Sequence, residues 1–168
     1  TVHAVRGHAL MTLDRIGEAK KELEAGTSLD PDNAEVVLLQ ARFKAATRDL
    51  ASALQLVEKL LSQDPRNLDA WIHRADLLLI MGKPKDAIAS FAKVIDIQPR
   101  HLSALVGRAI VLVQLGRMGD AQKDVDTLRM AHRKHPVSPY LRGQIHYWRG
   151  EFREALDMAQ GALKVNQD

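Results

Sequence analysis

The sequence predicts an all-α protein, a solenoid of five helical hairpins, and three observations support that prediction. First, the chain repeats every 34 residues, and the repeat aligns five alanines: Ala19, Ala53, Ala87, Ala121 and Ala155. Second, apolar residues recur within the repeats at the spacing of one helix face. Third, glycines and prolines recur between these apolar segments, where they end helices.

The five repeats fill the 168 residues, and we expect them to form a single domain. Their predicted boundaries are 1–33, 34–67, 68–101, 102–135 and 136–168. A second column holds only small residues, namely Gly7, Ala41, Ala75, Ala109 and Gly143. Small side chains let two helices approach closely. We therefore expect this column between the helices of one repeat, and the alanine column against the next repeat.

The third repeat shows the elements of one unit in order. Each of its two helices carries one apolar stripe. The stripe residues are Trp71, Ala75 and Leu78 in the first helix and Ala87, Phe91 and Val94 in the second. Gly82 can adopt the left-handed conformation that ends the first helix. Pro84 suits the first turn of the second helix because its missing amide hydrogen would have no helical partner there.

Short polar segments end the second helices. They read DPDN at 30–33 and DPRN at 64–67. Asn33 and Asn67 can each cap the helix that follows. His101 and His135 stand at the equivalent positions, so we expect both to open the next helix.

Composition narrows the class of function. The chain is 46% hydrophobic and 27% charged with a net charge of +3, so we expect a folded, soluble domain with a buried core. Acids and bases are interspersed and aromatic residues make up only 4%, which argues against a dedicated nucleic-acid groove. The absence of cysteine excludes disulfides, thiolate zinc sites and a cysteine nucleophile.

No apolar run approaches the roughly 18 residues that a membrane-spanning helix needs. The sequence also shows neither an initiator methionine nor a signal-peptide pattern. We therefore expect no direct membrane insertion of this segment, and we interpret it as a fragment of a longer array.

The third repeat resembles the tetratricopeptide repeat (TPR), whose pattern is Trp, two residues, Leu-Gly, two residues, Tyr, then Ala, three residues, Phe and a terminal Pro. The residues that fall on the Trp, Gly, Tyr, Ala, Phe and Pro positions are Trp71, Ala75, Leu78, Ala87, Phe91 and Pro99. The resemblance covers the whole chain. It implies a right-handed α-solenoid of five TPR helical hairpins, and a non-catalytic protein–protein interaction scaffold without a cofactor.

A second resemblance concerns the alanine- and leucine-rich repeats and the tail that begins HPVSPYLRGQIHYW. These look like the TPR lipoproteins of bacterial PEP-CTERM/exosortase systems. That resemblance implies an exported protein that is anchored to a membrane by a segment absent here. Without it, a cytoplasmic location is equally compatible with the sequence.

The TPR resemblance also implies where a partner binds, because family ligands usually contact the first helices along a concave groove. The positions carried over are Leu38, Arg42, Asp69, Ile72, Asp76, Leu79, Ile80, Val106, Val113, Gln114, Tyr140, Gln144, Tyr147 and Trp148. The groove is mostly apolar, and the Lys and Arg clamp by which chaperone-binding members hold a terminal carboxylate is missing. We expect an apolar peptide or protein segment as partner.

Within this groove, Tyr140, Tyr147 and Trp148 are the predicted anchors, because aromatic side chains dominate interface energetics. Shifting the last helix by one residue would instead place Tyr140 and Tyr147 on core positions. An alternative also stays open for the aliphatic members Leu38, Ile72 and Leu79. They could be packing contacts between adjacent first helices.

One column departs from the family, which has leucine there. It holds Arg6, Gln40, Arg74, Arg108 and Arg142. The arginines could form a basic ladder for an acidic ligand. The other interpretation is that their stems replace leucine in the packing while their charged groups reach acids such as Asp86, Asp120 or Glu154.

Catalytic and metal-binding patterns are not found. His132 and His135 lie three residues apart, but no nearby Asp, Glu or Cys completes a site, so we interpret them as residues of a solvated helix end. We find no glycine-rich phosphate loop, nucleophile elbow or carboxylate pair. Three functions stay open: a peptide-binding scaffold, a structural spacer or homo-oligomer joined through uncapped end repeats, and, least favoured, a nucleic-acid binder.

Overall fold

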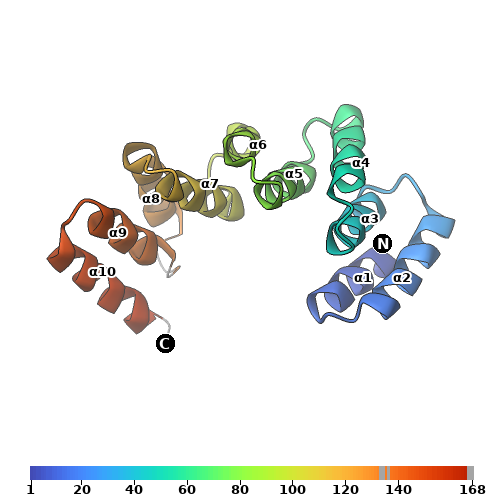
Figure 1. The fold of residues 1–168 in the computed structure, drawn as a ribbon, viewed down its shortest axis with the longest axis horizontal. Coiled ribbons are helices and arrows are strands. Elements are labelled where there is room, and N and C mark those ends of the chain that lie inside the picture. Colours follow the sequence, from blue (N-terminus) through green and yellow to red (C-terminus); the bar gives the residue numbers. More distant parts are fainter. Residues whose placement is uncertain (133–134, 136, 166–168) are drawn as a thin grey trace. The chain divides into compact units, whose positions relative to one another are not determined.

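The computed structural model describes residues 1–132, 135 and 137–165, with side chains up to residue 163. These residues form ten helices and no strand (Figure 1). The helices are α1 (Val2–Thr12), α2 (Ile16–Leu29), α3 (Ala34–Ala46), α4 (Leu50–Gln63), α5 (Leu68–Ile80), α6 (Pro84–Ile97), α7 (Leu102–Gln114), α8 (Met118–Ala131), α9 (Val137–Trp148) and α10 (Phe152–Val165).

The chain divides into two compact units, Thr1–Lys83 and Pro84–Asp168. In the first unit, α1 packs on α2 and α3 on α4 as hairpins, and α2 and α4 also contact α3 and α5, the first helices of the repeats that follow. In the second unit, α7 packs on α8 and α9 on α10, with α6 against α7 and α8 against α9. Within each unit, one repeat therefore covers the apolar face of the next.

The predicted caps of the first helices are confirmed. Asn33 Oδ1 accepts a hydrogen bond from the amide of Glu35 at 3.1 Å, and Asn67 Oδ1 from that of Ala70 at 2.9 Å. His101 Nδ1 accepts from Ala104 at 3.3 Å in the same place. Each side chain satisfies an amide that has no partner inside its helix.

The turn after each first helix uses one left-handed residue. Gly82, Gly116 and Gly150 have φ of 70°, 73° and 78°. The same position in the first two repeats holds Asp14 and Arg48, and their φ values are 57° and 69°. All five repeats thus make the same turn, although two of them lack the glycine that suits it.

We predict that Arg48→Gly stabilises the chain by about 0.5–1 kcal/mol, because a left-handed conformation costs an L-residue about 1–2 kcal/mol and glycine loses part of that gain to its flexible unfolded state. Urea unfolding followed by circular dichroism measures the change. The matched variant Gly82→Arg should shift the midpoint the other way. Equal midpoints for Arg48→Gly and the parent would contradict the strain argument.

Each unit has its own apolar core. The alanine column is buried where it faces a following helix, and Ala53 in the first unit and Ala121 in the second are 0% exposed. Each of these alanines belongs to a cluster of buried residues. The cluster of the first unit consists of Leu38, Ala41, Ala53, Val57, Leu60, Leu61, Ala70 and Leu77. The cluster of the second unit consists of Leu105, Ala109, Leu112, Val113, Ala121, Val125, Leu128, Leu141 and Ile145.

The region where α6 packs on α7 has no room for a larger side chain. Ala87 on α6 is 0% exposed. A Cβ atom on Gly107 of α7 would lie 2.5 Å from Cζ of Phe91. We predict that Ala87→Trp overpacks this region and costs about 1–3 kcal/mol or more. A thermal melt that matched the parent would contradict the packing assignment of Ala87.

Candidate partner-binding surfaces

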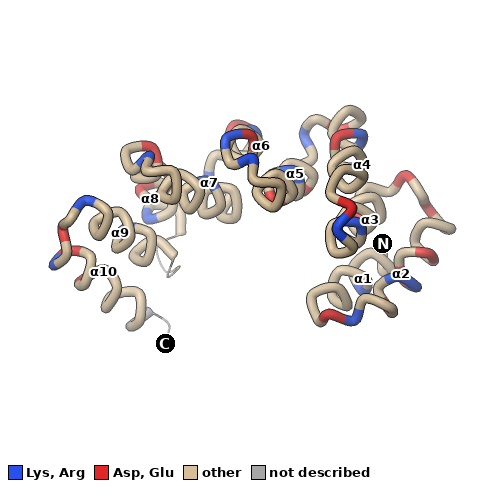
Figure 2. The backbone as a smooth tube through the Cα atoms, viewed as in Figure 1, with Lys and Arg blue, Asp and Glu red and all other residues tan. Residues whose placement is uncertain are grey.

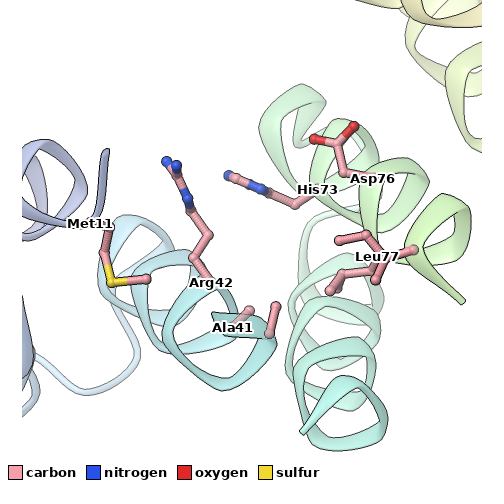
Figure 3. A pocket seen from close by; sticks show the side chains of 8 residues that line it. Met11, Ala41, Arg42, His73, Asp76 and Leu77 are labelled. Carbon is pink, nitrogen blue, oxygen red and sulfur yellow. The ribbon is translucent and has the colours of Figure 1, made fainter. Parts of the chain in front are cut away.

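The first surface is a groove on the first unit that lies along α1, α3 and α5, the first helices of three successive repeats; we call it the α1–α3–α5 groove. Its lining residues are Met11, Ala41, Arg42, Ala45, His73, Asp76, Leu77 and Ile80, and its volume is about 380 Å³. Figure 3 shows His73 extending toward the guanidinium of Arg42. The groove therefore has apolar walls and a small set of polar groups.

The polar groups of this groove are joined by short contacts. Nη1 of Arg42 lies 2.8 Å from Nδ1 of His8. Because a guanidinium can only donate, Nδ1 of His8 must accept, which assigns the proton of the neutral imidazole to Nε2. The rings of His8 and His73 stack with centroids 6.3 Å apart and planes inclined by 12°.

Burial and charge keep both imidazoles neutral. Burial, helped by the positive charge of Arg42 and by His8, lowers the pKa of His73 to about 4, against an opposing effect of Asp69. Burial and Arg42 lower the pKa of His8 in the same way. Loss of hydration raises the pKa of Asp76, although Arg42 opposes that effect. At neutral pH, Arg42 is therefore the only cation of this cluster.

The second surface lies on the last hairpin of the second unit, between α9 and α10; we call it the aromatic surface. It includes Tyr140, Tyr147 and Trp148, which are 51%, 60% and 65% exposed, and Phe152, which is 64% exposed. These side chains border a depression of about 640 Å³ that reaches Leu156 on α10.

The rings of the aromatic surface support one another. Tyr147 makes edge-to-face contacts with Trp148 at 6.3 Å and with Phe152 at 5.6 Å between ring centroids. Nε2 of Gln144 donates a hydrogen bond to the Tyr140 hydroxyl at 2.6 Å. Each aromatic pair contributes about 0.5–1.5 kcal/mol and favours this arrangement of the rings.

Comparison with known proteins then decides the family. Models of the family described as tetratricopeptide repeat match residues 5–67, 38–101 and 78–145. The chain belongs to the tetratricopeptide repeat family. TPR repeats are protein–protein interaction modules and are generally not catalytic.

Solved TPR structures share this fold at low sequence identity. The crystal structure of MamA protein is 16% identical with a TM-score of 0.75, covering 99% of this chain and 91% of that one. TTC0263, a thermophilic TPR protein of Thermus thermophilus, is 18% identical with a TM-score of 0.78, covering 96% and 89%. YrrB, "a TPR protein with an unusual peptide-binding site", is 16% identical with a TM-score of 0.70, covering 99% and 86%. No curated protein sequence matches the chain.

These TPR neighbours confirm the predicted fold class, an all-α solenoid of helical hairpins. Inside the last repeat, Leu141 and Ile145 are 0% exposed and fill the core positions of α9. Tyr140 and Tyr147 consequently face outward. The unshifted register of the last helix is the one that the structure has.

The two surfaces bring together half of the sequence-predicted TPR groove residues. Arg42, Asp76 and Ile80 line the α1–α3–α5 groove, and Tyr140, Gln144, Tyr147 and Trp148 line the aromatic surface. Asp69 is exposed, and its negative charge partly opposes the lowering of the His73 pKa.

The remaining predicted groove residues lie outside both surfaces. Leu38 is only 5% exposed and belongs to the first core, which favours the packing alternative for it, and Val113 is 4% exposed and belongs to the second core rather than to a groove. Val106 is half-buried against the second core. Ile72 and Leu79 are half-buried, and Gln114 is exposed.

The arginine column forms ion pairs, but with other acids than predicted. The shortest N–O distances are 3.0 Å for Arg6–Glu22, 3.1 Å for Arg74–Glu58 and 2.6 Å for Arg108–Asp124. In each pair the partners are 16 positions apart in the sequence.

The predicted partners Asp86, Asp120 and Glu154 stand 12 positions after their arginines, at the start of a second helix. Asp120 instead pairs with Arg117 at 2.7 Å and Lys123 at 3.3 Å. The choice of acids was therefore wrong. The interpretation that the charged groups are paired is confirmed for Arg6, Arg74 and Arg108.

The histidines at the end of the fourth repeat make backbone contacts. Nε2 of His132 lies 2.8 Å from the carbonyl oxygen of Arg100, and Nδ1 of His135 accepts from the amide of Val137 at 3.3 Å. Among the described residues, no group of three His, Asp or Glu side chains could hold a metal ion. No helix in the described part of the chain is long and apolar enough to cross a membrane.

Sequence reasoning missed His8, His73 and Phe152. His8 and His73 are 65 residues apart, which is not a multiple of 34, so no repeat column aligns them. Phe152 follows the turn at Gly150, where the equivalent residues are Pro84 and Met118. The available signal for Phe152 was an aromatic residue four positions after the predicted anchor Trp148.

Proposed function

We propose that the chain is a non-catalytic interaction scaffold that binds a peptide or protein segment, with the aromatic surface as its main contact. The observation that carries this proposal is the group of four aromatic side chains, each more than half exposed, on one hairpin: Tyr140, Tyr147, Trp148 and Phe152. Contiguous exposed apolar patches of this kind mark interaction sites.

The chemistry of the aromatic surface suits an apolar segment. Tyrosine and tryptophan provide large contact area at a small cost in side-chain entropy, and each can bury about 150–250 Å². Edge-to-face contacts favour the observed arrangement of the Tyr147, Trp148 and Phe152 rings. This arrangement lowers the cost of ordering the rings when a partner buries them.

Selection from a phage-displayed library of random 12-residue peptides on the 168-residue chain tests the proposal. Trp148→Ala should weaken the selected peptides at least tenfold by fluorescence anisotropy. The matched control is Leu29→Ala, which removes a 74% exposed leucine from α2 in the other unit. Circular dichroism should show parental helicity for both variants.

Two results would contradict this proposal. Equal affinity of the Trp148→Ala and Leu29→Ala variants for the selected peptides would remove the aromatic surface as the contact. Failure of the library to yield any peptide above background would argue against a peptide-binding scaffold altogether.

The second candidate function is a structural spacer or self-associating array. The observation that favours it is on α1, where Val2 and Val5 are 73% and 64% exposed. Their equivalents one repeat later, Val36 and Leu39, are 0% and 1% exposed, because α2 and α4 pack around α3. A second copy of the chain could cover the exposed valines.

Light scattering over a wide range of concentrations separates the two candidates. Growth of the mass with concentration, reversed by Val5→Ser, would favour self-association. A constant monomer mass would favour the scaffold.

A nucleic-acid function receives less support. The charged groups of Arg6, Arg74 and Arg108 are paired with acids, and Figure 2 shows basic and acidic residues interspersed along the chain. Nucleic-acid affinity that fell steeply with salt would reverse this judgement. The resemblance to PEP-CTERM lipoproteins, and the export that it implies, stays a prediction.

A further inference from the structure

We propose that the α1–α3–α5 groove selects a peptide segment that carries one acidic and one basic side chain next to an apolar residue. The acid would pair with Arg42 and the base with Asp76. This inference rests on the proposed function and adds a second contact, with its own ligand chemistry, on the other unit of the chain.

The first observation concerns Arg42. Its half-buried side chain extends from α3 into the groove (Figure 3), where Nη1 donates to the neutral imidazole of His8 at 2.8 Å. Among the described residues, no carboxylate oxygen is recorded within 4 Å of this guanidinium. A guanidinium has five N–H donors, so donors remain for a ligand carboxylate.

The second observation concerns Asp76 on α5, which stands one helical turn after His73 and lines the same groove. No hydrogen bond or ion pair of its carboxylate is recorded within the part of the chain that the structure describes. Its side chain is exposed, so a ligand can reach it, although the residues around it remove part of its hydration and raise its pKa against the charge of Arg42. A ligand ammonium or guanidinium group could therefore pair with this carboxylate in the groove.

Arg42 and Asp76 form no ion pair with each other, although both side chains line the same groove. Apolar side chains lie with them along the walls, namely Met11, Ala41, Ala45, Leu77 and Ile80. An acidic peptide would meet the negative charge of Asp76, and a basic peptide would meet the positive charge of Arg42. Such like-charge contacts disfavour the wrong ligands and so add to the specificity that the favourable contacts provide.

A peptide array provides the test. It holds acetylated and amidated ten-residue peptides with a frame of Ala, Leu and Ser, in which one Glu and one Lys occupy every pair of positions. Three matched sets replace the Glu, the Lys or both by Gln. The fluorescently labelled 168-residue chain is the probe, and fluorescence anisotropy then gives the Kd of the best Glu/Lys peptide and its three Gln relatives.

The expected result is a Glu/Lys peptide that binds at least tenfold more tightly than its double-Gln relative. Arg42→Gln should abolish the preference for Glu over Gln and keep the preference for Lys. Asp76→Asn should do the converse. The controls Arg66→Gln and Asp32→Asn remove charges outside the groove and should keep both preferences.

Equal binding of the Glu/Lys and double-Gln peptides would overturn the inference, and so would variants that weaken all four peptides by one factor. The same holds if the array gives no binding. These failures differ from failure of the proposed function, which is judged by peptides selected on the aromatic surface and by Trp148→Ala. Because Arg42 contacts His8, circular dichroism must show an intact fold for Arg42→Gln, and Asp76→Asn gives an independent answer.

Discussion

Replacing Arg108 by glutamine is expected to lower the free energy of unfolding by about 3 kcal/mol. Arg108 on α7 holds Asp124 on α8 through two hydrogen bonds, Nε to Oδ2 at 2.9 Å and Nη2 to Oδ1 at 2.6 Å. Asp124 is only 3% exposed. Removing one member of a buried ion pair leaves an uncompensated charge and costs about 3–5 kcal/mol, and glutamine can still donate one hydrogen bond, which favours the lower end of that range.

The second repeat supplies the matched control. At the positions equivalent to Arg108 and Asp124 it holds Gln40 and Leu56. The double variant Arg108→Gln/Asp124→Leu copies this pair and removes the buried carboxylate. We expect it to recover most of the lost stability, since an apolar pair of suitable size often equals a buried ion pair.

Urea unfolding of the parent, Arg108→Gln, Asp124→Leu and the double variant completes a thermodynamic cycle. A parental midpoint for Arg108→Gln would show that Asp124 does not depend on this guanidinium. A double variant no more stable than Arg108→Gln would show that lost packing, rather than the buried charge, causes the effect.

The repeat period predicted the local structure well because each hairpin is determined by residues close together in the sequence. The left-handed turn illustrates this. Gly82, Gly116 and Gly150 identified its position, and the structure extends the same turn to Asp14 and Arg48. The position within the 34-residue repeat therefore predicts this turn better than the presence of a glycine does.

Contacts between helices were less predictable, because they depend on how far neighbouring helices are displaced along their axes. The arginine column shows the limit. Periodicity placed the arginine column near the seam between repeats, but only the packing of α7 on α8 brings Arg108 to Asp124 rather than to Asp120.

The candidate surfaces were likewise predicted where their residues are close in the sequence and missed where the contact joins distant helices. Tyr147 and Trp148 are adjacent in the sequence and were predicted together. The stacking of His8 on His73 joins the first and third repeats of the first unit, and no column of the repeat contains both. Such a contact across repeats requires the three-dimensional structure.

Acidification is expected to destabilise the first unit between about pH 6.5 and pH 4 through His73. The pKa of His73 is about 4 in the folded chain, against an ordinary value of 6.5. Between these values the unfolded chain binds a proton that the folded chain does not, so the free energy of unfolding falls as the pH falls. At pH 4.5 the loss from His73 alone is about 2–3 kcal/mol relative to pH 7.

The charged neighbours modify this loss in known directions. His8, whose pKa is also lowered, adds to it. Asp76 opposes it, because a raised carboxyl pKa makes the folded chain bind its proton more readily than the unfolded chain does. Comparing the parent with His73→Gln isolates the contribution of His73, since both chains keep His8, Arg42, Asp69 and Asp76.

The difference in unfolding free energy between pH 7 and pH 4.5 should therefore be about 2–3 kcal/mol larger for the parent than for His73→Gln. NMR titration of the imidazole signals gives an independent reading. His73 should titrate near pH 4 in the parent and higher in Arg42→Gln, because the positive charge of Arg42 helps to lower its pKa. A His73 signal that titrates near pH 6.5 in the parent would contradict the burial and charge arrangement on which the ligand chemistry of the α1–α3–α5 groove depends.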